Sequence, residues 1–579
     1  MKLPAFSSSP FPALGRRLRR WGGNGQRGHQ RGQWFSGWTL AVGAIASLVM
    51  LPILMVLQTA THVQWDLWQH LASTVLPTYI LNSIALGLGV GIITVVLGTV
   101  MAWLVSLCRF PGQRWFEWAL LLPMAIPAYL LAYTYTDFLD FYGPVRTLIE
   151  SSTGWGPQDY WFPNIRSLGG AIAMLSLVLY PYVYLLVRVA FLEQSTVTLE
   201  ASRLLGRTPL QSFWAVALPL ARPAIMAGLA LVLMETLSDF GTVQFFGVET
   251  FTTGIYRTWF GLGDRPAASQ LAALLLVFVM GLLTLERASR GQAKHYGNEN
   301  YKTATPYVLR GWHQWGAIAF CATPLLLGFF VPAGCLLTMA TRELQKDFSL
   351  VTDEQFLGFA VNSIVVGSIT AAIAVITALI LGYGRRLYPH WLVRLGTRLA
   401  AMGYAVPGSV VAVGLLLPLG WFDRTLDTYM ENTFNVSTGL LLSGSMAALV
   451  FAYLVRFLSV AFGTVETSLT KIKPNFDDAS RSLGHTPTQT LWRIHLPLLR
   501  GGLLTAVLLV FVDSVKELPA TLIVRPFNFD TLAVRVYNLA SDERLVEAAL
   551  PAIAILVVGL IPTLLLSWQI ATSRQLKSQ

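Results

Sequence analysis

Long apolar segments dominate this sequence and leave few folds open to it. A helix needs about 20 apolar residues to cross a bilayer, and lipid offers the backbone no hydrogen-bonding partner outside a helix or a closed barrel. By that measure the sequence predicts twelve membrane-spanning helices, six in each half. They are 38–58, 78–106, 117–137, 168–190, 223–246, 268–286, 315–340, 358–382, 397–421, 438–463, 501–524 and 548–570. Only 12% of the residues are charged, against about 25% in soluble proteins. We therefore expect an all-α integral membrane protein embedded in a lipid bilayer.

The sequence also repeats itself once. Residues 200–223, EASRLLGRTPLQSFWAVALPLARP, recur as residues 478–501, DASRSLGHTPTQTLWRIHLPLLRG, at a shift of 278 positions. So long a period indicates a duplicated domain rather than a solenoid. Each copy predicts a helix, a left-handed break at a glycine, and a second helix that is capped by Thr-Pro and stopped at Leu-Pro.

The repeat defines the expected domain organisation. An even number of spans per repeat gives the two halves the same orientation, related by an axis along the membrane normal. The expected parts are a basic tail (1–37), a first domain (38–286) with its loop at 193–222, a linker (287–313), and a second domain (314–573) with its loop at 466–500.

Lysine and arginine predict the orientation of the chain. The tail, the linker and the loops at 193–222 and 466–500 hold 20 of the 41 basic residues, while residues 59–77 contain none. Basic loops stay on the cytoplasmic side of a membrane, so both termini and both repeated stretches are expected to be cytoplasmic. The net charge of +11 is then a property of cytoplasmic loops, and no nucleic-acid partner is expected.

The repeated stretches resemble the coupling loops of binding-protein-dependent ABC importer permeases. That motif reads Glu-Ala-Ala, three residues, Gly, and about nine residues later a hydrophobic residue, any residue and Leu-Pro. In a membrane protein such a stretch more often only anchors its neighbours, but its recurrence at the same place in both halves favours a docking role. The first copy fits the motif well, and the second departs at Asp478, where the charge is kept, and at Ser480. The residues that carry the resemblance are Glu200, Ala201, Ser202, Gly206, Leu218, Pro219, Asp478, Ala479, Ser480, Gly484, Leu496 and Pro497.

The resemblance implies a type I ABC importer permease fold whose loops dock on ATPase subunits. The chain has no G-x-x-x-x-G-K-[ST] motif and no Gly-Lys dipeptide, so it has no phosphate-binding loop of its own. We expect a permease that is not itself an enzyme and binds no cofactor. ATP and magnesium would be bound by two copies of a partner ATPase.

Two further strings are similar to the signatures of ferric-iron permeases. They are METLSDFGTVQFFGVETFTTGIYRTW at 234–259 and KELPATLIVRPFNFDTLAVRVY at 516–537. This resemblance implies import of ferric iron across a bacterial inner membrane, delivered by a periplasmic ferric-iron-binding protein. Thiamine, phosphonate or polyamine is the alternative cargo. An ion-coupled secondary transporter is the alternative class, because such carriers also often have twelve spans in two repeats, although they need no ATPase dock.

Four carboxylates are candidates for the cargo path. Glu235 and Asp239, with their repeat equivalents Asp513 and Glu517, lie four residues apart and are expected to share one helix face deep in a span. Charges at that depth are costly and mark a path or a buried pair. Oxygen ligands suit a hard cation, while a structural pairing with Lys516 is the alternative. No metal site is assigned from the sequence.

Overall fold

A computed structural model describes most of the chain. It covers residues 36–59, 61, 65–141, 143–156, 159–193, 202, 204–289, 307–351 and 353–578. Nearly all of the predicted tail, together with Glu200 and Ala201, lies outside these residues.

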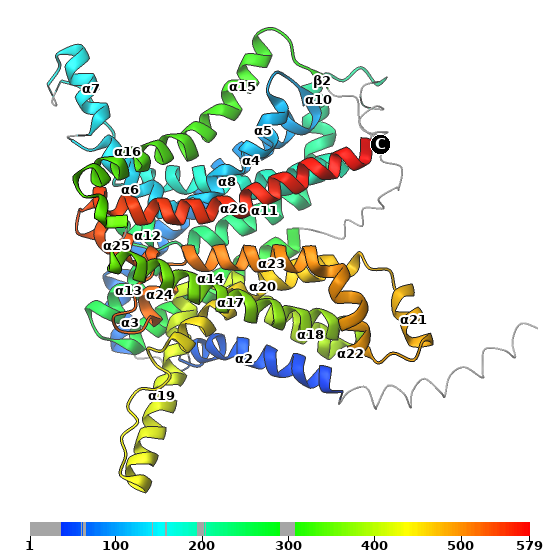
Figure 1. Cartoon of the computed structure of the whole chain (residues 1–579). Coiled ribbons are helices and arrows are strands. Elements are labelled where there is room, and N and C mark those ends of the chain that lie inside the picture. Colours follow the sequence, from blue (N-terminus) through cyan, green and yellow to red (C-terminus); the bar gives the residue numbers. More distant parts are fainter. Residues whose placement is uncertain are drawn as a thin grey trace, which may run out of the picture.

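Helices make up almost the whole of the described chain (Figure 1). The first half contains α2 (Gly37–Thr59), α3 (Trp65–Ser73), α4 (Leu76–Leu107), α5 (Gln113–Ala119), α6 (Ala128–Leu139), α7 (Pro144–Thr153), α8 (Leu168–Glu193), α10 (Pro209–Ser212), α11 (Leu218–Ser238), α12 (Gly241–Phe245), α13 (Phe251–Tyr256) and α14 (Arg265–Ser289). The second half contains α15 (Trp312–Leu325), α16 (Val331–Lys346), α17 (Glu354–Leu387), α18 (Trp391–Ala400), α19 (Gly408–Phe434), α20 (Met446–Thr470), α21 (Asn475–Ser482), α22 (Pro487–Thr490), α23 (Leu496–Lys516), α24 (Pro519–Val524), α25 (Leu532–Ser541) and α26 (Leu545–Ser578).

The span count agrees with the prediction. Within the described residues, eleven helices are long and apolar enough to cross a membrane, or twelve if the pair bent by 88° around Pro127 is one span. Pro127 precedes α6 and Pro407 precedes α19, so the two repeats break at equivalent places. The predicted all-α membrane fold is confirmed.

Several predicted span limits are wrong for local reasons. The helix of span 397–421 begins only at Gly408, after Pro407, and continues to Phe434. Spans 223–246 and 501–524 end early, because α11 stops at Ser238 and α23 at Lys516, and a short separate helix follows each. The helix predicted from 438 begins only at Met446, because the residues before it return along α19.

The two halves exchange their first helices. Helix α2 packs on α17, α18 and α19 of the second half, while α16 packs on α6 of the first half and on α26. The contact is close at Gly414, where a Cβ atom would lie 2.2 Å from the carbonyl oxygen of Pro52. Each of the two hydrophobic cores therefore contains residues of both halves.

The end of the linker is attached to the first half. Strand β2 (Tyr307–Val308) pairs in parallel with β1 (Cys108–Arg109), which follows α4. The ring of Tyr307 lies 6.4 Å from that of Trp103. The linker thus rejoins the molecule close to the first repeated stretch.

Candidate functional site: coupling loops and interface acids

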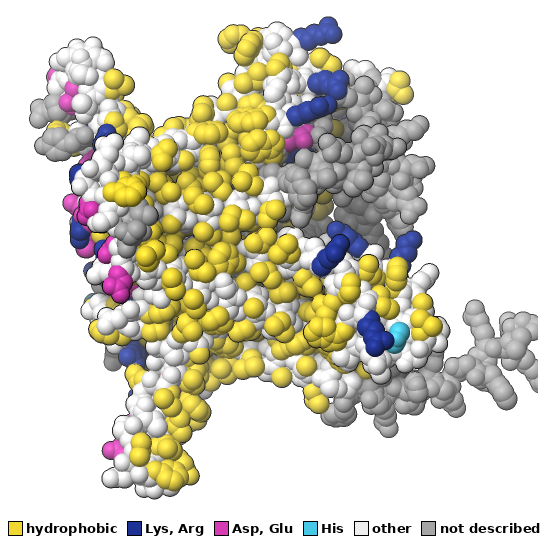
Figure 2. Space-filling model, viewed as in Figure 1, with side chains coloured by type: hydrophobic (Ala, Val, Ile, Leu, Met, Phe, Trp, Pro, Cys, Tyr) yellow, Lys and Arg dark blue, Asp and Glu magenta, His cyan; other side chains and the backbone are white. Residues whose placement is uncertain are grey.

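Both repeated stretches lie at one end of the molecule. In Figure 1, α10, α21 and α22 are on the right, at the opposite end from α7 and α25. Figure 2 shows lysine and arginine side chains mainly at the right end, acidic side chains mainly at the left, and an apolar belt between them.

The turn geometry of the two loops is the same and follows the prediction. Gly206 has φ of 75° and Gly484 has φ of 79°, the left-handed region in which a side chain is strained. Thr208 caps α10 through a capping box with Gln211, and the second loop repeats this arrangement. The proline that follows each threonine occupies the first helical turn, where a missing N–H costs nothing.

A buried hydroxyl pair fastens each loop. The Oγ atoms of Ser202 and Ser212 lie 2.8 Å apart, and Ser480 Oγ lies 2.7 Å from Thr490 Oγ1. The motif identified Ser202 and Ser480, but sequence reasoning missed their partners. The signal was available, since Ser212 and Thr490 are both hydroxyl residues at the 278-residue shift.

The predicted stop at Leu-Pro is wrong. A π-helical turn, Phe213–Ala217 or Leu491–His495, connects the short helix of each loop directly to α11 or α23. Pro219 and Pro497 fall in the first turn of these helices. The wider π-helical turn precedes the proline, and the helix continues into the membrane. Each loop is therefore helically continuous with a span.

Each loop exposes the same pair of large apolar side chains. Leu205 and Leu483 are 79% and 76% exposed, and Trp214 and Trp492 are 62% and 68% exposed. Exposed apolar groups at matching positions are typical of a docking surface. The duplication gives the chain two such surfaces.

The loops differ in how they attach to the first long helix of their own half. In the second half, Arg386 of α17 donates from Nε to Asp477 of α21 at 3.0 Å, and His495 Nε2 lies 3.1 Å from the other carboxylate oxygen of Asp477. In the first half, Trp103 of α4 instead packs edge-on against Phe213, with ring centroids 5.2 Å apart. Tyr383 of α17 also donates its hydroxyl to Pro487 O at 2.8 Å, so among the described residues the second loop is held by both charges and an aromatic side chain, and the first by aromatic packing.

Asp239 caps a short helix instead of continuing a long one. Its carboxylate accepts from the backbone N–H groups of Thr242 and Val243, each at 3.1 Å, and from Thr242 Oγ1. Helix α11 ends one residue earlier, with Asp239 in an extended conformation. The expectation that Glu235 and Asp239 share one helix face is therefore wrong, because the capping interaction ends the helix between them.

Glu517 repeats this arrangement with an added counter-charge. It caps α24 by accepting from Ala520 N at 2.9 Å and Thr521 N at 3.0 Å. Arg456 Nη1 of α20 donates to Glu517 Oε1 at 2.9 Å, and both side chains are buried. Gly408 leaves room for the pair, since a Cβ there would lie 2.6 Å from Arg456 Nη1.

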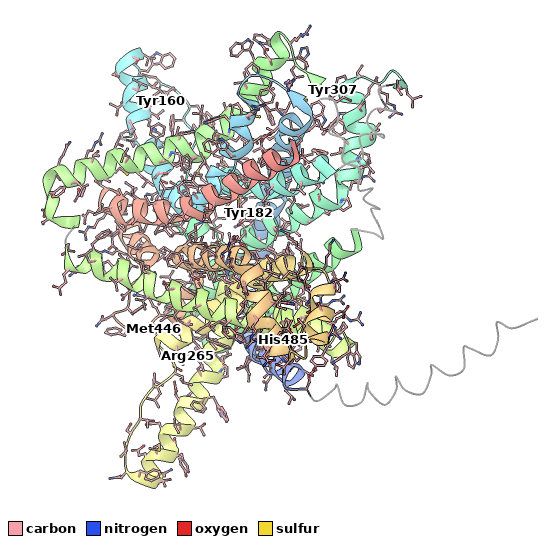
Figure 3. The ribbon with its side chains drawn as sticks, turned by 45° about the vertical axis from the view of Figure 1, so that its right-hand side comes forward. Tyr160, Tyr182, Arg265, Tyr307, Met446 and His485 are labelled. Atoms are coloured by element: carbon pink, nitrogen blue, oxygen red, sulfur yellow. The ribbon has the colours of Figure 1, made fainter. Side chains whose placement is uncertain are left out.

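Arg456 also reaches the first half of the chain. Its Nη2 lies 3.9 Å from Glu235 Oε2, so one guanidinium lies between a carboxylate of each half. Lys516 Nζ crosses the interface in the same way and donates to the carbonyl oxygen of Met124 at 3.1 Å. Figure 3 marks this central region with Tyr182, which lies near the middle of the molecule. The acids are thus gathered between the halves, and two cations lie among them.

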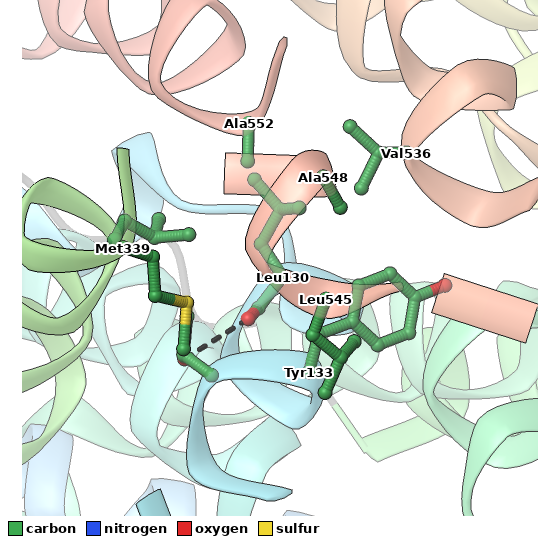
Figure 4. A pocket seen from close by; sticks show the side chains of 9 residues that line it. Leu130, Tyr133, Met339, Val536, Leu545, Ala548 and Ala552 are labelled. Carbon is green, nitrogen blue, oxygen red and sulfur yellow. Dashed lines mark hydrogen bonds between the residues drawn. The ribbon is translucent and has the colours of Figure 1, made fainter. Parts of the chain in front are cut away.

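Two cavities differ greatly in size. The one in Figure 4 holds only about 10 Å³ and is lined mainly by apolar side chains of α6, α16, α25 and α26, so it is a packing defect between the halves. The other, of about 580 Å³, lies between α12 and α13 and contains the Glu249–Arg257 ion pair, whose atoms are 3.2 Å apart. Burial, with a smaller contribution from Tyr537, raises the pKa of Tyr256 at its rim to about 12, so this phenol stays protonated at neutral pH.

The duplicated helical bundle, its paired loops and the acids at its centre define a polytopic membrane permease. Comparison with known families identifies it further. The family described as the binding-protein-dependent transport system inner membrane component matches residues 94–285 and 374–572. The chain belongs to this family, and it contains two copies of the family's domain. It is accordingly a multi-pass inner-membrane permease of the ABC importer class.

Individual relatives extend the similarity to most of the chain. The chain is 27% identical over 498 residues to the Fe(3+)-transport system permease protein FbpB 2 of Haemophilus influenzae, covering 84% of this chain and 88% of the relative. It is 23% identical over 535 residues to the ferric transport system permease protein FbpB of Actinobacillus pleuropneumoniae, covering 86% and 72%. It is also 28% identical over 261 residues to the sulfate transport system permease protein CysT of Salmonella typhimurium, covering 43% and 90%.

Proposed function

We propose that this chain is the complete membrane channel of an ATP-driven importer that carries ferric iron from a periplasmic binding protein to the cytoplasm. The observation that carries the proposal is the doubled loop, with the same left-handed glycine, capping box and exposed Leu–Trp pair in each copy. Two equal docking surfaces on one chain match two copies of one ATPase subunit. ATP and magnesium are bound there, and this chain contributes the docking surfaces and the path.

The interface acids support a cationic cargo. Among the described residues, the cations that lie with Glu235, Asp239, Asp513 and Glu517 are Arg456 and Lys516, so carboxyl groups outnumber cations at the interface. Carboxylate oxygens are the ligands that hard cations prefer. Ferric iron fits this chemistry and the names of the two ferric relatives.

Sulfate is the second candidate, because sulfate permeases match 43% of the chain. A dianion would meet four carboxylates at the interface and would be repelled by them. The charge at the interface therefore favours iron over sulfate. The two cargoes are distinguished directly by uptake of labelled iron or labelled sulfate.

The orientation follows from charge. The end that carries the loops is rich in lysine and arginine, and the opposite end is acidic (Figure 2). Since basic segments stay cytoplasmic, we place both termini and both loops in the cytoplasm and the acidic end in the periplasm. Reporter fusions at Gln579 and near Lys294 should both indicate a cytoplasmic location, and a periplasmic signal at either would contradict this orientation.

The decisive test uses the glycines of the loops in proteoliposomes that contain the partner ATPase and binding protein. Gly206→Val and Gly484→Val together strain both left-handed turns. We expect iron uptake and its ATP hydrolysis to fall at least tenfold while the protein stays folded in the membrane. The matched control is Gly501→Ala, because a Cβ there meets nothing within 4 Å and φ is not positive.

Two outcomes refute different parts of the proposal. Normal ATP-dependent uptake by the double glycine variant would show that the loops do not couple, and uptake without any ATPase would indicate a secondary transporter. Full iron uptake by the combined Glu235→Gln, Asp239→Asn, Asp513→Asn and Glu517→Gln variant would leave the permease intact and remove only the acidic path.

A further inference from the structure

Two arms project from the molecule at the end opposite the coupling loops. The second arm, residues 419–445, is the far part of α19 and the segment that returns from it. The first residues of α19, Gly408–Leu415, are buried. From Leu416 to the end of the helix at Phe434, Asp423 is the one buried residue. In Figures 1 and 3 this part of α19 leaves the body at the lower left and runs across the direction of α2 and α26 rather than along it.

Hydrogen bonds from two aspartates hold the second arm in a fixed conformation. Asp427 Oδ1 accepts from Thr438 N at 2.7 Å and Gly439 N at 2.9 Å, and the carboxylate of Asp423 accepts from Leu442 N and Ser443 N at 3.0 and 2.7 Å. The two acids of α19 thereby fasten the returning segment along its length. An arm held in this way presents a fixed surface.

That surface is strongly apolar. Phe422, Leu426 and Tyr429 are spaced by four and three residues and so lie on one face of α19. Large exposed side chains of the arm are Phe422 (45%), Tyr429 (60%), Phe434 (61%), Val436 (52%), Leu440 (67%) and Leu441 (51%), while Trp421 (67%) lies on the face of Thr425 and Thr428. An apolar patch of this extent marks an interaction surface.

The first arm, residues 140–167, leaves the first half at the corresponding point of the repeat. It contains α7 and projects at the upper left of Figure 1, with Tyr160 at its end in Figure 3. The Tyr160 hydroxyl donates to Glu150 at 3.3 Å, and Arg146 lies 4.4 Å from the ring centroid of Phe162. Exposed apolar side chains recur here, with Leu148 at 66%, Trp155 at 53% and Trp161 at 86%.

The apolar sides of the arms face the belt of the membrane spans. In Figure 2 the hydrophobic side chains of each arm lie mainly on its right-hand side, toward that belt, while the acidic ones lie to the left. The belt is where lipid contacts the protein, so the apolar faces are continuous with the lipid-facing surface. Tryptophan and tyrosine are also the residues that gather where a bilayer meets water.

We propose that both arms lie in the headgroup layer of the bilayer, in the leaflet opposite the coupling loops, with their apolar faces toward the acyl chains. Such in-plane amphipathic helices attach chiefly by burying apolar area. The second arm carries three acids and one arginine, so zwitterionic phospholipid, and not an anionic lipid, is the partner that it fits. Arms on opposite flanks would hold the molecule upright in the membrane while its halves move.

Spin-label accessibility on the full-length protein in phosphatidylcholine nanodiscs tests this proposal. Single labelled cysteines replace Phe422, Leu426 and Tyr429 on the apolar face, or Thr425, Thr428 and Glu431 on the polar face, after Cys108, Cys321 and Cys335 are changed to alanine. We expect the apolar positions to be several-fold more accessible to oxygen than to a water-soluble nickel chelate, and the polar positions to show the reverse. Leu88 on α4 and the loop residue Glu543 serve as lipid and water references, since they are 61% and 78% exposed.

Equal access of the nickel chelate to both faces, in nanodiscs without any partner protein, would overturn the proposal. Shielding of the apolar face only after the binding protein is added would also overturn it and would assign the surface to that protein. A second variant, Phe422→Ser, Phe434→Ser and Leu440→Ser, should release the arm and raise nickel access at a label on Leu426 several-fold. Its control, Thr425→Ser, Thr428→Ser and Asn432→Ser on the polar face, should change nothing.

Discussion

Replacing Arg456 with methionine tests the charge balance between the two halves. The guanidinium donates to Glu517 at 2.9 Å and lies 3.9 Å from Glu235, and the Glu517 side chain is only 1% exposed. Removing one partner of a buried ion pair typically costs about 3–5 kcal/mol. Glu517 keeps its hydrogen bonds from Ala520 and Thr521, so we expect the lower end of that range, about 3 kcal/mol.

The measurement is reversible unfolding in mixed micelles, followed by a probe in α20. The matched control is the double variant Arg456→Met, Glu517→Gln, in which the buried charge is absent and the amide oxygen still accepts from the backbone. This double variant should recover most of the free energy of unfolding that Arg456→Met loses, because replacing a whole buried pair is often nearly neutral. The reasoning is refuted if Arg456→Met is as stable as the parent protein, or if the double variant is no more stable than the single one.

Three smaller predictions concern the packing around the pair and the loops. Gly408→Ala places a Cβ within 2.6 Å of the buried pair and should cost about 1–3 kcal/mol. Gly463→Ala in α20 meets nothing within 4 Å and should not lower the melting temperature, because alanine favours a helix interior. Thr208→Ala and Thr486→Ala each remove a capping box and should cost about 1 kcal/mol locally. Faster hydrogen exchange in α10 and α22 would confirm this, and unchanged exchange would exclude it. Asp477→Asn should accelerate exchange in α21, because Asp477 ties the second loop to Arg386 and His495; an equal change in α10 would contradict that.

Features set by local rules were predictable from the sequence. A run of about 20 apolar residues has few alternatives to a membrane helix, so α2, α4 and α8 lie close to their predicted limits. A glycine before Thr-Pro is a local signal as well, and Gly206 and Gly484 adopt the expected left-handed turn.

Features set by contacts between distant segments were not predictable in this way. The assumption that Glu235 and Asp239 share one helix failed because a carboxylate can also cap the helix that follows it, and spacing alone does not distinguish the two. The exchange of α2 onto the second half depends on the fit of Gly414 against Pro52, more than 350 positions away. Hydropathy along the chain contains no signal for such a fit.

The differences between the halves are as informative as their likeness. The turn geometry of the loops is kept, with φ of 75° and 79° at the two glycines and similar exposure of the paired leucines. The supports behind the described parts of the loops differ, because the second loop has the ionic contacts of Asp477 in addition to an aromatic contact, Trp103 in one half and Tyr383 in the other. Identical ATPase subunits would require equal surfaces but place no such demand on what lies behind them. The central cations also differ between the halves. Arg456 and Lys516 both come from the second half, and the equivalent residues of the first half, Val178 and Ser238, are uncharged. A single chain can therefore place its compensating charges in one half of an interface whose acids come equally from both halves.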